Sequence, residues 1–241
     1  MPGARLSRHE LKTQDEITSS LRSFTGILET RKKEILIAIA AVILVVVAIV
    51  GWRAYSGRRN AAASVQLASA VASFEDPSIK PDKVRYEKAA AEAQKTIDSY
   101  GSTSAGIIAR YYLAMSQDRL GDTATAEKNM QEVVDRGDSS IKGVAQFALA
   151  HLQAKHGGSA KAIETLTQLY NSGSYPKSAV AFDLASFYEA SGQQEQAKQY
   201  YGKVITDTPD SRFRQESESA LKRMGAPVPV PPAPVPVPAK P

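Results

Sequence analysis

The chain has 241 residues, no cysteine and a formal net charge of +5 at pH 7. The lack of cysteine excludes disulfides, thiolate metal sites, cysteine nucleophiles and an acylated cysteine anchor. All of the net charge lies in residues 1–59, which hold 10 basic and 5 acidic residues. The remaining residues hold 20 of each and are neutral. This neutral balance argues against a nucleic-acid-binding surface.

Residues 1–33 precede a long apolar run and are expected to be partly an amphipathic helix. Ile17, Leu21, Phe24 and Leu28 fall on one helical face. Two interpretations stay open. The segment is either a solvated juxtamembrane region, or a helix that lies on the inner leaflet or docks a cytoplasmic partner.

The apolar run predicts a transmembrane helix over residues 34–55. No charged residue occurs between Glu34 and Arg53, and the 18 residues from Ile35 to Trp52 would span about 27 Å as a helix, close to the hydrocarbon thickness of a bilayer. A soluble core helix would keep a polar stripe, which is missing. A cleaved signal peptide is disfavoured because a long segment precedes the run and no small-residue cleavage site follows it directly.

Basic residues around this run suggest its orientation. Seven lie before it and three after it, so the positive-inside rule places the N-terminus in the cytoplasm and the large C-terminal part outside the inner membrane. Tryptophan and tyrosine suit the far interface. The expected interface anchors are Arg31, Lys32, Lys33, Trp52, Arg53 and Tyr55.

Residues 60–224 are predicted to be helices separated by short turns, with an internal repeat. Three segments align on their turn glycines: 109–134, 145–170 and 180–205, at offsets of 36 and 35 residues. The recurring positions are Leu113, Leu149 and Leu184; Gly121, Gly157 and Gly192; Ala126, Ala162 and Ala197; and Met130, Leu166 and Tyr201.

Each recurring position has a physical role in a helix pair. The leucine fills the space between the two helices, and the glycine ends the first helix where a positive φ is needed. The alanine permits a close crossing, and the bulky residue one turn later packs into the next repeat. The pattern therefore predicts an all-α fold in which helix pairs stack as an α-solenoid.

This pattern resembles the tetratricopeptide repeat. The third repeat supplies every fixed place of that family, including Tyr188 and Pro209, whereas the first two carry Gln117 and Gln153 at the tyrosine place and lack the final proline. Within this resemblance, the missing proline, whose place is taken by Asp138 and Ser174, implies looser junctions after these two repeats. The expected boundaries are 60–101 for a degenerate repeat, 103–138, 139–174 and 175–209 for the full repeats, and 210–224 for a capping helix.

Residues 225–241 form a Pro-rich tail, "GAPVPVPPAPVPVPAKP", expected to be extended polyproline II and disordered. It is either a stiff spacer or a peptide ligand for a partner domain.

No catalytic or cofactor-binding motif occurs in the sequence. Phosphate-loop, dinucleotide-binding and nucleophile-elbow patterns are missing, and carboxylates are scattered over helix exteriors. His151 and His156 are five residues apart, which does not place them on one helical face as two metal ligands require. We therefore expect a non-enzymatic protein without cofactor or metal, whose partners are proteins.

The first helices of such a solenoid line a concave groove, and groove residues recur at fixed places. The candidate peptide-binding groove consists of Tyr111, Met115, Asp118, Phe147, His151, Phe182, Ser186 and Glu189. Three aromatics in register suit extended or unfolded segments of other proteins. The alternative is that these aromatics pack between helices.

The order of a short N-terminal segment, one spanning helix ending in "GWRAY" and then helical repeats resembles the membrane-anchored tetratricopeptide family of the ancillary SecYEG translocon subunit. This resemblance implies a bacterial inner-membrane protein whose repeats lie on the periplasmic side, near the translocon, and hold or hand on exported proteins. The competing hypothesis is a structural scaffold for cell-envelope assembly or cell division.

Overall fold

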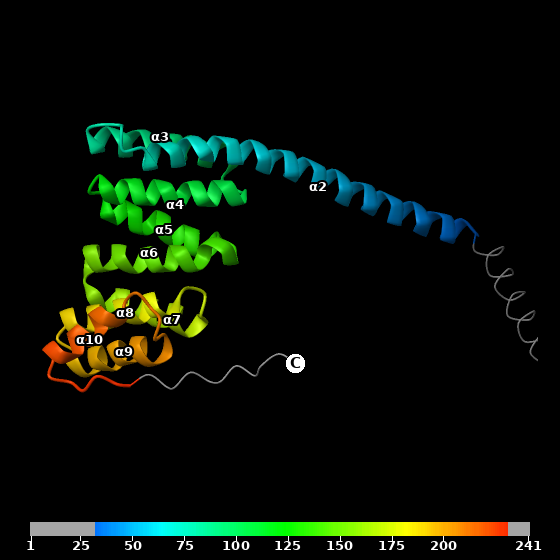
Figure 1. The fold of residues 1–241 in the computed structure, drawn as a ribbon. Coiled ribbons are helices and arrows are strands. Elements are labelled where there is room, and N and C mark those ends of the chain that lie inside the picture. The colour runs from blue at the N-terminus through cyan, green and yellow to red at the C-terminus, as the bar shows by residue number, and fades with distance from the viewer. Residues whose placement is uncertain (1–31, 231–241) are drawn as a thin grey trace, which may run out of the picture. The chain divides into compact units, whose positions relative to one another are not determined.

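A computed structural model describes residues 32–230, which hold nine helices and no strand (Figure 1). The all-α prediction is confirmed for this part of the chain. The helices are α2 (Lys32–Glu75), α3 (Asp82–Tyr100), α4 (Ser104–Arg119), α5 (Thr123–Arg136), α6 (Ser139–Gly157), α7 (Ser159–Ser172), α8 (Lys177–Ala190), α9 (Gln194–Asp207) and α10 (Arg214–Arg223). The expected amphipathic segment before α2 and the end of the Pro-rich tail lie outside the described residues.

The chain divides into two compact units, with the boundary between Arg58 and Arg59. The first contains the apolar part of α2, which among the described residues is the one helix long and apolar enough to cross a membrane. Its most apolar 18 residues have a mean hydropathy of 2.1 and none of them is buried. The helix continues to Glu75, whereas the sequence suggested a spanning helix over residues 34–55 and a separate repeat from residue 60. No proline interrupts these residues, and Gly57 is tolerated inside a helix.

The second unit is a stack of helices in which each helix from α3 to α9 packs on its successor (Figure 1). Its core follows the repeat: the predicted leucines, alanines and bulky residues are all buried. The alanine pairs at the centre of the three repeats are fully buried: Ala114 and Ala126, Ala150 and Ala162, Ala185 and Ala197.

The end of α2 packs with α3 where the sequence predicts a degenerate repeat. Ala70 of α2 shares a buried cluster with Ala93 and Ile97 of α3 and with Leu113 of α4. Ala90, which lies 36 residues before Ala126 and so at the equivalent place of the repeat, only borders this cluster. The register of α3 therefore differs from that of the full repeats.

The turn glycines follow the prediction in two repeats out of three. Gly121 and Gly192 have φ of +92° and +74°. In the second repeat Gly157 is the last residue of α6, and the positive φ of +91° belongs to Gly158. The prediction was wrong there because α7 begins at once at Ser159, which leaves Gly158 as the only residue between the helices.

The capping helix is shorter than the sequence suggested. α10 begins at Arg214, and Ala220 and Leu221 bury one side of it against α9. Phe213 precedes it in a turn.

Gly143, near the start of α6, marks a close approach between repeats. A Cβ at this position would lie 2.1 Å from the backbone carbonyl oxygen of Ser174, in the turn before α8. Because this obstacle is backbone, rotation of a side chain cannot relieve it.

We therefore expect Gly143→Ala to destabilise the repeat unit by about 1–3 kcal/mol, as overpacking does. Gly157→Ala, in the same helix, is the matched control: a Cβ there meets nothing within 4 Å, so alanine should leave stability unchanged or raise it by up to about 1 kcal/mol. Urea denaturation followed by circular dichroism measures both. Equal midpoints for the two variants would contradict the close approach.

Candidate functional site

The candidate site is formed by α4, α6 and α8, the first helices of the three full repeats, which we call the first-helix row. All eight predicted groove residues lie on these helices. Seven of their side chains are half-buried, and only that of His151 is exposed. The row therefore combines packing positions with positions that a ligand can reach.

Two aromatics of the row stack on rings from later in the chain. Phe147 stacks on Tyr175 with ring centroids 4.5 Å apart, and Phe182 stacks on Phe213 at 4.9 Å. Tyr175 lies in the turn before α8 and Phe213 in the turn before α10, so each stack joins a first helix to the segment that opens the next repeat or the cap. Neither partner was predicted from the sequence, where the only signal is an aromatic residue within a polar turn.

The third aromatic, Tyr111, contacts Tyr112 edge-on at 5.6 Å and packs with Met115 against the core shared by α4, α5 and α6. Burial raises the pKa of Tyr111, so its hydroxyl stays neutral at physiological pH. The geometry favours the alternative in which the three aromatics pack between helices. Their half-exposed edges remain on the surface, and their role in binding stays a prediction.

Charged residues of the row pair across repeat boundaries. The Nζ of Lys155 on α6 donates to the Oδ1 of Asp118 on α4 at 2.7 Å. The Nε2 of His151 lies 2.8 Å from the Oδ2 of Asp183 on α8, and its ring contacts Phe147 edge-on at 5.0 Å. Asp118 is thus already engaged by the next repeat, and His151 bridges the second and third repeats.

Glu189 is engaged in the same way at the end of the row. Its carboxylate accepts a hydrogen bond from the Nη2 of Arg223 at 2.7 Å and one from the hydroxyl of Tyr201 at 2.8 Å. The bond from Arg223 is the main cause that lowers the pKa of Glu189. The Ser186 hydroxyl lies 3.3 Å from that of Tyr201. Both predicted groove residues therefore connect α8 to α9, and Glu189 also connects it to α10.

In every full repeat, the residue at the tyrosine position of the family pattern contacts the second helix of that repeat. Its partner is always twelve residues later. The pairs are Gln117 with Asn129, Gln153 with Thr165, and Tyr188 with Tyr200. Hydrogen bonds of 2.8 and 2.7 Å in the first two repeats replace the ring stack of the third. Glutamine at this place therefore still ties the two helices of its repeat together.

The two histidines of the repeats face different carboxylates. His156 lies 2.9 Å from Glu127, which also pairs with Lys161, whereas His151 faces Asp183. Within residues 32–230, no group of three or more potential ligands could hold a metal ion.

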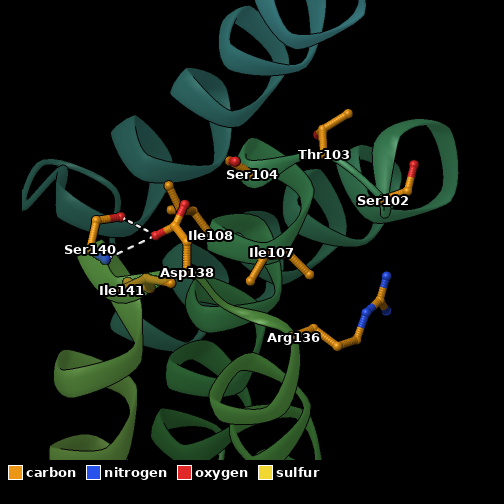
Figure 2. Close-up of a pocket in the computed structure, with 9 residues that line it drawn as sticks. All are labelled: Ser102, Thr103, Ser104, Ile107, Ile108, Arg136, Asp138, Ser140 and Ile141. Carbon is orange, nitrogen blue, oxygen red and sulfur yellow. Dashed lines mark hydrogen bonds between the residues drawn. The ribbon is translucent and has the colours of Figure 1, made fainter. Parts of the chain in front are cut away.

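A small cavity of about 120 Å³ lies where the start of α4 meets the α5–α6 turn (Figure 2). Three of its polar side chains are engaged: Thr103 caps α4 at the amide of Gly106, Asp138 accepts from Ser140, and Arg136 donates to the carbonyl of Gly101. None of the predicted groove residues lines it. This cavity belongs to the helix junction.

The expected membrane-interface residues lie in the first unit. Trp52 and Tyr55 are 70% and 60% exposed, with ring centroids 6.5 Å apart, and Arg53 and Lys33 are exposed as well. Arg31 lies outside the described residues. Exposure of large aromatic side chains fits a lipid interface, where their rings are only partly hydrated.

The ion pair at Glu189 predicts a pH-dependent effect of Glu189→Gln. Because the folded pKa is lowered, the carboxylate stabilises the fold above its ordinary value of 4.5, and this contribution disappears as the pH falls through the folded pKa. We expect the variant to denature at lower urea than the native protein at pH 7, by less than Gly143→Ala, and the difference to diminish as the pH falls below 4.5. Glu195→Gln, which removes a pair whose carboxylate is 84% exposed, is the control and should change little. A difference independent of pH would contradict this assignment.

Comparison with known proteins agrees with this architecture. No curated protein matches the chain. A family model described as a tetratricopeptide repeat-like domain matches residues 32–223, which include all nine described helices. The helix pairs, their buried alanines and the extent of this match show that the chain belongs to the tetratricopeptide repeat-like domain family.

Proposed function

We propose that this protein is a non-enzymatic, membrane-anchored interaction module that holds extended, apolar segments of other proteins along the first-helix row. Repeats of this family generally serve to bind proteins. The half-exposed edges of Tyr111, Phe147 and Phe182 recur at one place in each repeat and so suit a ligand that runs across all three.

The observation that carries this proposal is the engagement of the row's carboxylates within the protein. Asp118, Asp183 and Glu189 each face a basic side chain of a neighbouring repeat or of the cap. A strongly charged ligand would have to displace these pairs and leave one partner unmatched, at a cost in binding free energy. Apolar and aromatic side chains meet no such cost at the aromatic edges.

At a finer level, we propose a translocon-associated adaptor or chaperone-like binder of exported polypeptides. An unfolded chain exposes the apolar side chains that a folded protein buries, and such segments match the aromatic edges of the row. Support also comes from the order of anchor and repeats and from the "GWRAY" sequence at the end of the apolar run. The second candidate is a scaffold for envelope assembly or cell division, supported by the Pro-rich tail.

In-cell photo-crosslinking tests the partners. A photo-reactive residue at position 151, the exposed one among the eight residues proposed for the groove, should capture subunits of the Sec channel and assorted exported chains. One at Lys128, exposed on α5, should not. Phe147→Ala should reduce capture at position 151, because it removes an aromatic edge beside that side chain.

Mass spectrometry of the captured proteins decides between the two candidates. Recovery of cell-wall or division proteins alone would overturn the adaptor and favour the scaffold. Equal capture at positions 151 and 128 would contradict binding along the first-helix row.

We also propose that the protein spans the bacterial inner membrane once, with a cytoplasmic N-terminus and external repeats. The excess of basic residues before the apolar run supports this orientation. A periplasm-dependent phosphatase fused after Pro241 should therefore be active, and the same reporter fused before Met1 inactive. The opposite pattern would reverse the topology.

A further inference from the structure

The C-terminal sequence contains one hexapeptide twice. Ala-Pro-Val-Pro-Val-Pro occupies residues 226–231 and again 233–238, with Pro232 between the copies. The structure describes the first copy as far as Val230, and the second lies outside the described residues.

The end of α10 directs the first copy back onto the repeat unit. Gly225 has φ of +66°, its amide donates to the carbonyl of Lys222 at 3.1 Å, and the amide of Ala226 donates to the carbonyl of Leu221 at 2.9 Å. These two bonds around a left-handed glycine are a Schellman motif, which satisfies the last carbonyls of the helix and reverses the chain. The tail therefore begins in a defined direction.

The first copy then lies on a surface of α9 and α10 that we call the tail seat. Ala226 and Val228 pack against the cluster that contains Tyr201 and Leu221. The tail seat is lined by five residues of α9 and α10, which are Glu195, Lys198, Gln199, Gly202 and Leu221. The start of the Pro-rich tail, expected to be disordered from residue 225, is thus packed against the last repeat and the cap as far as the structure describes it.

Gly202 of α9 faces Pro229 of the segment. A Cβ built there would lie 3.8 Å from the Cγ of Pro229, and it would meet no other neighbour within 4 Å. An open depression of about 440 Å³ lies beside the segment and is lined by residues of α9, by Leu221 and by Ala226, Pro227 and Pro229. The segment is therefore seated by a few side-chain contacts, which allows it to be exchanged.

Proline-rich segments suit such a seat for a general reason. Their polyproline II conformation is largely formed before binding, so little conformational entropy is lost, and recognition rests on side chains that fit a groove. The second copy carries the same side chains in the same order, so it can pack in the same way.

We propose that the tail seat is a recognition site for Ala-Pro-Val-Pro-Val-Pro, and that the second copy, residues 233–238, fills the tail seat of a second molecule of this chain. A move of the second copy into its own seat would require residues 226–232 to loop out. Four of these seven residues are prolines, which resist a tight reversal. A neighbouring molecule is the better acceptor.

In the acceptor, the incoming copy replaces a segment of identical sequence, so the side-chain contacts of the seat can be the same before and after, as in other exchanges of identical elements. The exchange is limited mainly by the cost of bringing two molecules together, so it depends on their local concentration. The donor segment and the tail seat are different surfaces, so the interaction links molecules in a head-to-tail manner.

Disulfide trapping in the cysteine-free full-length protein tests this proposal. One chain carries Gly202→Cys, and a second carries Pro236→Cys, the position in the second copy that corresponds to Pro229. Mixed under mild oxidation, they should form a disulfide-linked heterodimer. The yield should be about tenfold above that of Ala239→Cys, three residues further on, because a seated segment raises the effective thiol concentration.

Two further variants keep the result interpretable. Gly202→Cys with Pro229→Cys in one chain should close an internal disulfide, which checks that cysteine at these positions still allows seating. A Gly202→Cys acceptor that ends at Gly225 has no first copy to displace and should give a still higher heterodimer yield.

Two outcomes would overturn the proposal. One is equal heterodimer yields for Pro236→Cys and Ala239→Cys. The other is exclusive internal closure in a chain that carries both Gly202→Cys and Pro236→Cys, which would place the second copy in its own seat.

Discussion

The close packing of helix pairs around buried alanines is the interaction on which the rest of the fold depends. A pair of helices cannot cover its own apolar surface, so each core is completed by the next element in the chain. Three of the core clusters show this directly: they join α4, α5 and α6, then α6, α7 and α8, then α8, α9 and α10. A side chain larger than alanine at these crossings would separate the helices and open all of the packing that follows.

The same constraint explains how the stack ends. The last repeat has no successor, so α10 supplies Ala220 and Leu221 to its core, and the Schellman turn at Gly225 adds Ala226 and Val228. The sequence composition of the tail predicts disorder, but its first residues pack on the last repeat and help to cover its core. Sequence composition describes the average character of the tail, whereas its first residues are placed by a backbone motif.

The residues that make polar contacts vary more between repeats than the buried alanines do, because a polar side chain needs only one matching partner in the facing helix. Gln117 and Gln153 depart from the aromatic residue of the family pattern, and Asn129 and Thr165 in the facing helices supply the matching groups. The hydrogen bond from Thr165 gives the amide oxygen of the buried Gln153 side chain a partner. Variation in the family pattern therefore does not by itself loosen a repeat.

Periodic features were accessible from sequence because they are local or recur at a fixed interval. The bounds of α3, the buried leucines and alanines, and the apolar stretch of α2 follow from patterns within a few turns of helix. The eight residues proposed for the groove lie on α4, α6 and α8, as the repeat spacing implied. The glycine of the second repeat was misplaced by one residue, because the length of α6 depends on how closely α7 follows it.

By itself, the sequence determined an apolar span followed by an all-α stack of helix pairs, since residue spacing encodes which face of each helix is buried. Only the tertiary structure decided which side chains the residues proposed for the groove contact. The stacks on Tyr175 and Phe213 and the pair of Lys155 with Asp118 join residues about one repeat apart. These partners recur at no fixed place in the repeat pattern, so they become neighbours only when one repeat packs on the next.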